Sequence, residues 1–438
     1  MKVKKSFALL MYSIGYIGIS ILVQTTVKWY QYFYAPPEAN QGGLKVLIPL
    51  GFIGFTMIIA RIFDGVADPV VAYYSDNARS KLGRRIPFIL YGSLPLCLSF
   101  VLIWFPPVQG ESIWNFIYLT AMLSLFFIFF TIVVGPYLAL IGEVTSNNKE
   151  RMNLTMMQGI TQVIGVMIAE AGSGALIQGP NFKIMGIVLG LISFATLILT
   201  PIFIKENVEE SQSIQQQPTI GLMSSLSKTL KNRNFIYYLV PYLAIWFGIN
   251  TLTIAMPYIS EILLGMSAES SGFLIAGAFV VAVLFSPFLP SITVKYGKKK
   301  VMILSSFAFG ILLILLGLFG TLLKGYAAYI VVFLAGIPLS AALIVPNAMV
   351  ADIAELDGIE TGVRREAMFF GTQGLINKIV IGLSSLVTPL LFKAFGYSIE
   401  NPLGLQLCGP IAGIIVLAGI VILNKYSLKE DELQALRK

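Results

Sequence analysis

Residues 45–75 read KVLIPLGFIGFTMIIARIFDGVADPVVAYYS, an apolar run that carries one arginine and two aspartates near its middle. The run exceeds the roughly 20 apolar residues that a helix needs to cross a bilayer. Of all 438 residues, 56% are hydrophobic and only 12% are charged, whereas soluble proteins contain about 25% charged residues. This composition argues against a water-soluble domain and, despite the net charge of +8, against a nucleic-acid-binding protein. It predicts a helical protein that crosses the membrane many times.

Twelve apolar runs along the chain are long enough to cross a membrane. They lie near residues 6–34, 45–75, 87–105, 114–142, 153–178, 184–204, 235–264, 269–292, 301–322, 326–354, 366–396 and 405–424. A polar stretch after the sixth run separates six helices from six. The sequence therefore predicts an N-terminal six-helix bundle over 1–204, a cytoplasmic linker over 205–234, a C-terminal six-helix bundle over 235–424 and a cytoplasmic tail over 425–438.

Basic residues are concentrated on alternate loops. With the N-terminus on the cytoplasmic side, most of the 30 lysines and arginines fall on cytoplasmic segments, as the positive-inside rule requires. We therefore expect a multi-pass protein of the plasma (inner) membrane, with both termini in the cytoplasm.

Two motifs recur at nearly the same distance along the chain. The Gly-Arg-Arg loop at 83–85 corresponds to the Gly-Lys-Lys-Lys loop at 297–300, 214 residues later, and Pro136 corresponds to Pro346, 210 residues later. Basic loops on one side of the membrane are expected of any polytopic protein, but they do not explain the matched spacing. Two six-helix halves in parallel repeat, with substrate bound between them, are typical of major facilitator transporters. The sequence predicts an all-α membrane protein with this fold.

Asp64 and Asp68 are four residues apart and therefore project from one face of the predicted helix. Counted back from Asp76, they lie about 18 and 12 Å inside the span at 1.5 Å per residue, and half the hydrocarbon core is about 15 Å. Two carboxylates so close and so deep need a cation, a proton or a basic partner. Pro69 has no N–H, which leaves the Gly65 carbonyl free to act as a further oxygen ligand. Such ligands suit an alkali cation.

Three other side chains bear on this acid pair. Arg61 is three residues from Asp64, so a static salt-bridge network is the alternative to a coupling-ion site. Thr131 offers a hydroxyl oxygen, although threonine often bonds to its own helix. Lys378 lies deep in the eleventh predicted helix, where an unpaired lysine is costly. It either exchanges with the cation during transport or forms a static bridge between the halves.

Further polar and aromatic residues lie within the predicted spans, where they either line a substrate cavity or hold helices together. They are Gln24, Lys28, Trp29, Glu170, Trp246, Asn250, Thr251, Asn347, Gln373 and Asn377. The loops on the predicted cytoplasmic side suggest a gate, for which plain positive-inside anchoring is the alternative. The gate residues are Asp76, Gly83, Arg84, Arg85, Arg364 and Arg365.

Two long motifs resemble those of a known family. Residues 61–69, then Asp76 and 81–88 (KLGRRIPF), resemble the helix 2–3 signature of the glycoside–pentoside–hexuronide:cation symporters, which are melibiose permease-like. Residues 346–353 and 361–371 resemble the same family's helix 10–11 signature. In that family, two acids on helix 2 and a threonine on helix 4 bind the coupling cation, with a lysine on helix 11 nearby. The resemblance implies these roles for Asp64, Asp68, Thr131 and Lys378.

The sequence departs from the family pattern at the positions that hold the sugar. Ser20 and Val134 stand where the family has two sugar-binding aspartates, and the family's basic residue on helix 5 falls near Gln158 or Gly159. Ala67 stands where a side-chain amide can assist sodium binding, so both sodium and proton coupling stay open. The wider family also includes lysophospholipid transporters, and an amphipathic substrate suits a cavity without those carboxylates.

We expect a cation-coupled (Na⁺ or H⁺) secondary symporter for a sugar or glycoside, working by alternating access. A lysophospholipid-like substrate is the alternative within transport, and a membrane-embedded receptor or enzyme is the alternative outside it. The sequence has no histidine and two cysteines, and it lacks a nucleophile elbow and a phosphate-binding loop. We therefore expect no enzymatic activity, no cofactor beyond the coupling ion and no metal other than Na⁺. We expect a monomer in the lipid bilayer that binds a small-molecule substrate and no nucleic acid.

Overall fold

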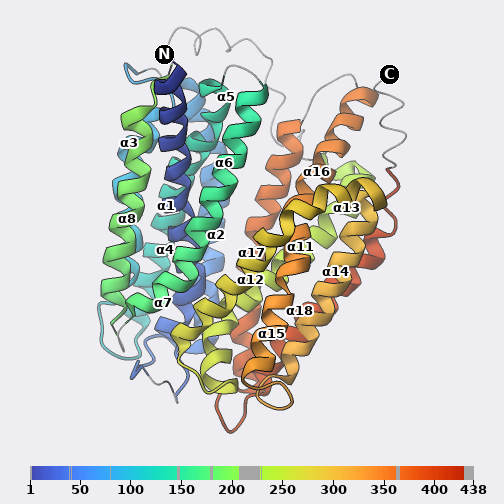
Figure 1. Cartoon of the computed structure of the whole chain (residues 1–438). Helices are drawn as coiled ribbons and strands as arrows, with labels where there is room; N and C mark the ends of the chain where they lie inside the picture. The colour runs from blue at the N-terminus through green and yellow to red at the C-terminus, as the bar shows by residue number, and fades with distance from the viewer. Residues whose placement is uncertain are drawn as a thin grey trace. The chain divides into compact units, whose positions relative to one another are not determined.

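The computed structural model describes residues 2–38, 40, 42–78, 80–145, 148–177, 181–206, 227, 229–361 and 366–428 (Figure 1). The chain divides into two compact units. The first unit comprises Met1–Gln217 and Ser267–Gly272, and the second comprises Pro218–Met266 and Phe273–Lys438. Over the described residues both units consist of helices and connecting turns, and an isolated β-bridge joins Phe319 and Leu323.

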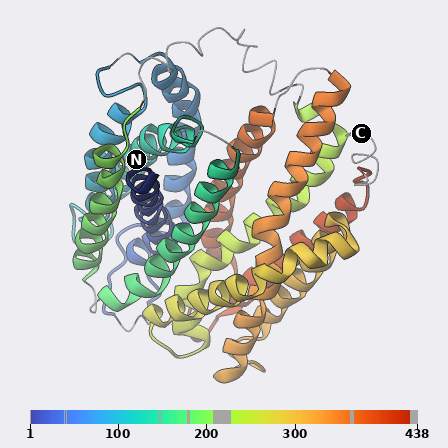
Figure 2. The ribbon, with the colours of Figure 1, turned by 45° about the horizontal axis from the view of Figure 1, so that its top comes forward.

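The first unit contains the helices that carry the acid pair. Its elements are α1 (Lys2–Tyr34), α2 (Leu50–Asn77), α3 (Ile86–Ile103), α4 (Ile113–Ala139), α5 (Ile141–Val144), α6 (Asn148–Met167), the π-helical turn η1 (Ile168–Gly172), α7 (Ser173–Leu176) and α8 (Phe182–Phe203). Neighbouring long helices pack in the order α6, α1, α8, α3, α4 and α2. The dark-blue α1 lies among the other helices of this unit in Figure 2.

Two glycines let α1 approach its neighbours closely. A Cβ atom on Gly18 would lie 2.4 Å from the Thr196 hydroxyl oxygen of α8. A Cβ atom on Gly165 of α6 would lie 2.6 Å from the Ile17 carbonyl oxygen of α1. No larger side chain fits at either crossing, and small residues at such crossings are typical of membrane helix bundles. This packing fixes α1 between α6 and α8 and so positions the polar residues along it.

The second unit is built in the same way from long helices broken by prolines and glycines. The elements from Arg233 onward are α11 (Arg233–Tyr258), η2 (Ile259–Leu263), η3 (Ala268–Ser270), α12 (Ser271–Phe285), η4 (Ser286–Phe288), α13 (Leu289–Tyr296), α14 (Lys298–Leu315), η5 (Leu316–Leu318), α15 (Tyr326–Leu334), α16 (Gly336–Thr361), α17 (Glu366–Phe395) and α18 (Leu403–Leu423). Of these, η3 and the start of α12 belong to the first unit. Within this unit α18 packs against α11, α14 and α17, and α16 packs against α14.

The prediction of twelve membrane spans is confirmed, because twelve helical segments among the described residues are long and apolar enough to cross a bilayer. Some predicted ends are wrong. The second helix begins at Leu50 rather than 45, directly after Pro49. The predicted helix at 326–354 is interrupted at Ala335 and continues to Thr361. Pro338 explains the interruption, since it has no N–H to bond to the Leu334 carbonyl.

Candidate functional site

The two acids predicted from helix periodicity meet a hydroxyl on α4. Thr131 Oγ1 lies 2.6 Å from Asp64 Oδ1 and 3.1 Å from Asp68 Oδ1. Asp64 is completely buried, whereas Asp68 is partly exposed. A hydroxyl has one proton, so Thr131 can donate to only one of the two carboxylates at a time. The arrangement therefore brings one oxygen atom from each of the three side chains within hydrogen-bond distance.

Arg61 supplies the positive charge beside these acids. Its Nη1 lies 3.0 Å from Asp64 Oδ2, and the centre of its guanidinium lies 3.9 Å from the centre of the Phe127 ring. Such a cation–π contact stabilises a desolvated cation. With Arg61, Asp64 and Asp68 ionised, the cluster carries a net charge of −1. We call Arg61, Asp64, Asp68 and Thr131 the acid cluster.

The backbone around the acid cluster agrees with the sequence interpretation. α2 runs without a break from Leu50 to Asn77 and contains Pro69 in its interior. Because proline has no N–H, the Gly65 carbonyl has no helical donor at that position. Gly65 is partly exposed. Its participation as an oxygen ligand remains a prediction.

The structure therefore brings together the residues singled out on helices 2 and 4, all in the first unit. Lys378, predicted to act with them, lies on α17 of the second unit and is partly exposed. Its coupling role remains a prediction. The sequence interpretation missed Phe127, which is one helical turn before Thr131 on α4. That spacing places the two side chains on one face of α4.

The residues predicted to line a cavity occupy both units. In the first unit, Trp29 and Glu170 are buried and Gln24 is partly exposed. Trp29 Nε1 donates a hydrogen bond of 2.7 Å to Ser173 Oγ, and Glu170 forms an ion pair of 3.1 Å with Lys28. These contacts join α1 to the π-helical turn η1 and to α7.

In the second unit, the predicted cavity residues lie on α11 and α17, and Asn347 lies on α16. Tyr238 donates a hydrogen bond of 2.8 Å from its hydroxyl to Gln373 Oε1. Asn250 donates from Nδ2 to the Trp246 carbonyl oxygen over 2.8 Å. Trp246 and Asn377 are partly exposed, whereas Asn250 and Gln373 are buried. Their role toward a substrate remains a prediction.

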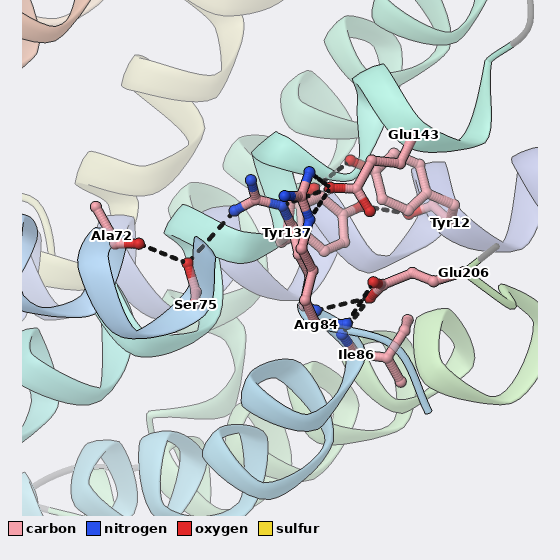
Figure 3. A network of polar contacts seen from close by, with 9 residues as sticks. Tyr12, Ala72, Ser75, Arg84, Ile86, Tyr137, Glu143 and Glu206 are labelled. Atoms are coloured by element: carbon pink, nitrogen blue, oxygen red, sulfur yellow. Dashed lines mark hydrogen bonds and ion pairs between the residues drawn. The ribbon is translucent and has the colours of Figure 1, made fainter. Parts of the chain in front are cut away.

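The predicted gate residues of the first unit form a polar network (Figure 3). Glu143 Oε1 accepts hydrogen bonds from the Arg84 guanidinium at 2.8 and 3.0 Å and from Arg85 Nε at 2.8 Å. Gly83, which precedes them, has φ +103° and so adopts a conformation that favours glycine. Asp76 lies in the last turn of α2. Arg364 and Arg365 lie outside the described residues.

Glu206 completes this network and was not predicted from the sequence. It accepts hydrogen bonds from the backbone N–H groups of Arg84, Arg85 and Ile86 at 2.6, 2.8 and 2.6 Å, respectively. Ile86 begins α3, so the carboxylate satisfies N–H groups at a helix N-terminus. Burial raises the pKa of the Glu206 carboxyl, and Glu143 nearby also raises it, against the opposing effect of the three N–H donors.

The second unit repeats the arrangement at the corresponding positions. Lys298 Nζ forms an ion pair with Asp352, as the Arg84 guanidinium does with Glu143. Gly297, immediately before Lys298, has φ +80° and matches Gly83. The same glycine, base and acid thus recur in both halves. This recurrence supports the internal repeat that the sequence predicts.

Comparisons with known proteins agree with this architecture. A family model described as MFS/sugar transport protein matches residues 11–423. An uncharacterized symporter of Synechocystis sp. is 24% identical, in an alignment that covers 90% of this chain and 86% of that symporter. The putative glycoside/cation symporter YagG of Escherichia coli is 29% identical, in an alignment that covers 42% of this chain and 34% of YagG. The sodium-dependent lysophosphatidylcholine symporter 1 of Gallus gallus is 22% identical, in an alignment that covers 87% of this chain and 80% of that symporter.

A solved structure, that of the nucleoside transporter NupG, resembles the fold with a TM-score of 0.68 at 11% identity, covering 98% of this chain and all of that one. The predicted major facilitator fold and the resemblance to cation symporters are therefore confirmed. The matched family and the structural neighbour are transporters. With twelve apolar spans in the part of the chain that the structure describes and a family model that covers nearly its whole length, the chain belongs to the MFS/sugar transport protein family and is an integral, multi-pass membrane symporter.

Proposed function

We propose that this protein is a cation-coupled symporter in which the acid cluster binds the coupling ion. The observation that carries the proposal is the meeting of Asp64, Asp68 and the Thr131 hydroxyl within hydrogen-bond distance. Oxygen ligands of this kind suit a hard cation. The coupling ion is Na⁺ or H⁺.

The net charge of the acid cluster favours the binding of one monovalent ion. Arg61 offsets one of the two carboxylates, so the ionised cluster has a net charge of −1. One Na⁺ or one proton brings it to zero, and a net charge is costly at membrane depth. The loaded cluster therefore favours states from which water is excluded. A divalent cation would leave a net charge of +1.

The protein exposes the loaded site alternately to the two sides of the membrane. We place it in the plasma membrane with both termini in the cytoplasm, which assigns the networks of Glu143 and Asp352 to the cytoplasmic side. In this scheme they stabilise the loops of each half, and Lys378 couples ion occupancy to closure. The protein works as a monomer.

The substrate we favour is a sugar or glycoside, in keeping with the description of the family model and with the name of the Escherichia coli relative. The second candidate is a lysophospholipid. It is favoured by the relatives named lysophosphatidylcholine symporters. It is also favoured by Ser20 and Val134, which stand where the resembled family has sugar-binding aspartates.

The decisive experiment is uptake into proteoliposomes under imposed ion gradients. Purified protein is tested with labelled methyl glycosides and with labelled lysophosphatidylcholine, under an inward Na⁺ gradient and, separately, an inward proton gradient. We expect accumulation of a glycoside driven by one of the two gradients. Accumulation of lysophosphatidylcholine and of no glycoside would select the second candidate. Uptake that is unchanged by either gradient would refute cation coupling.

A further inference from the structure

A second buried charge pair lies in the first unit and shares no residue with the acid cluster. Lys28 Nζ on α1 is 3.1 Å from Glu170 Oε2 on η1, and both side chains are completely buried. The Lys28 ammonium also donates to the Glu170 backbone carbonyl oxygen over 2.8 Å. A buried ion pair is costly unless its remaining hydrogen-bonding capacity is satisfied.

The two partners of this pair differ in what remains unsatisfied. Lys28 has three N–H donors; the Glu170 carbonyl takes one and the carboxylate faces another. Apart from that ion pair, neither carboxylate oxygen of Glu170 accepts a hydrogen bond within the described part of the chain. The Gln24 side chain lies beside the carboxylate. The unmet need is therefore for hydrogen-bond donors.

The local backbone fixes the position of the Glu170 carboxylate. Residues Ile168–Gly172 form a π-helical turn, in which the Ser173 N–H bonds to the Ile168 carbonyl. Trp29 ties α1 to this region through its hydrogen bond to Ser173. Single π-helical turns inside α-helices occur frequently at functional sites, because they place one side chain out of the regular pattern.

We propose that Glu170 binds two adjacent hydroxyl groups of a transported polyol, as found on a sugar, and that Lys28 is the positioning residue that holds the carboxylate in place. This inference rests on the proposed function and names the substrate class for it. Two neighbouring O–H groups supply two donors to the two carboxylate oxygens and bring no charge, so the pair stays neutral as a whole.

Other ligand classes fit the pair less well. A cationic group would leave the site with the uncompensated charge of Lys28, and an anionic group would face the Glu170 carboxylate. The phosphocholine group of a lysolipid carries a quaternary nitrogen and an ionised phosphodiester, which offer no N–H or O–H donor. Gln24 is partly exposed beside the buried carboxylate.

The test uses a variant that removes both charges together, so that neither is left buried alone. Lys28→Met combined with Glu170→Gln keeps the net charge of the protein. The matched control, Lys183→Met combined with Glu111→Gln, removes one charge of each sign at exposed positions of the same unit. Binding of methyl glucoside, methyl galactoside and methyl xyloside, and of Na⁺, is measured by calorimetry on the purified full-length proteins.

We expect the Lys28/Glu170 double variant to bind the responding glycoside about 10- to 100-fold more weakly, as the loss of hydrogen bonds to a charged acceptor predicts. Its Na⁺ affinity and both affinities of the control should match the wild type. A deoxy glycoside that lacks one of the adjacent hydroxyls should bind to the wild type more weakly than the parent glycoside does. In the double variant the two glycosides should bind with equal affinity.

An unchanged glycoside affinity in the double variant would overturn the role of Glu170 and leave cation-coupled transport intact. If the double variant does not fold, the deoxy series on the wild type decides, and equal affinity across that series overturns the inference. Binding of lysophosphatidylcholine and of no glycoside by the wild type would overturn it as well. If the wild type binds the glycoside as expected but shows no dependence on a coupling cation, the proposed acid cluster is refuted and the hydroxyl site is not.

Discussion

Replacing Asp68 by Asn tests the acid cluster most directly, because the amide keeps the shape of the side chain and removes one charge. The cluster of Arg61, Asp64 and Asp68 then changes from a net charge of −1 to zero. Two unit charges about 4 Å apart interact by about 4 kcal/mol at an effective dielectric constant of 20. We therefore expect the affinity for the coupling cation to fall about 1,000-fold.

The assay is a Na⁺ and pH titration of purified Asp68→Asn protein, followed by gradient-driven uptake in proteoliposomes. Asp68 is partly exposed, so the variant should still fold. Its unfolding temperature should be close to that of the wild type. Glu111→Gln is the control, since it removes a carboxylate from an exposed position outside the spans. Concentrative uptake at the wild-type level by Asp68→Asn would refute the assignment of the cation site.

Three further outcomes follow from the structure. Lys378→Ala should bind the cation at least as tightly as the wild type but transport poorly; wild-type uptake rates would reduce Lys378 to a packing or bridging role. Arg61→Gln should leave Asp64 buried without its charge partner and lower the free energy of unfolding by about 3–5 kcal/mol, which denaturant titration measures. The raised pKa of Glu206 means that the folded state binds its proton more tightly than the unfolded state. Its contribution to stability is therefore present at low pH and lost as pH rises from about 4.5 through the raised pKa, and Glu206→Gln should abolish this dependence in thermal unfolding; an identical pH profile in variant and wild type would contradict it.

The sequence predicts those features that depend on local spacing and on the cost of burying charge. The twelve spans follow from the lengths of apolar runs, and Asp64 and Asp68 share a face because they are four residues apart. Thr131 was a weak candidate from the sequence alone, and only the family resemblance implied a role for it at the cation site. Arg61 forms an ion pair with Asp64, three residues away. A salt bridge there was one of the two alternatives that local spacing left open.

Contacts between distant helices could not be predicted in the same way. Lys28 and Glu170 are 142 residues apart in sequence, and nothing in either apolar run specifies which helices become neighbours. Phe127 contacts Arg61 only because α2 packs along α4. Glu206 lies at the start of a stretch that reads as a polar linker, so its position at the N-terminus of α3 depends on where α8 ends.

The spacing of Arg61 and Asp64 also has a consequence for how this helix enters the membrane during synthesis. Each of these residues alone costs about 2.5–3.5 kcal/mol at the centre of an inserting helix. Because they are three residues apart on the same helix and 3.0 Å apart in space, they can pair as soon as α2 forms, before any other helix is present. The segment then passes from the translocon into lipid as a neutralised pair, and the energetic barrier to its insertion is lower than the separate costs indicate.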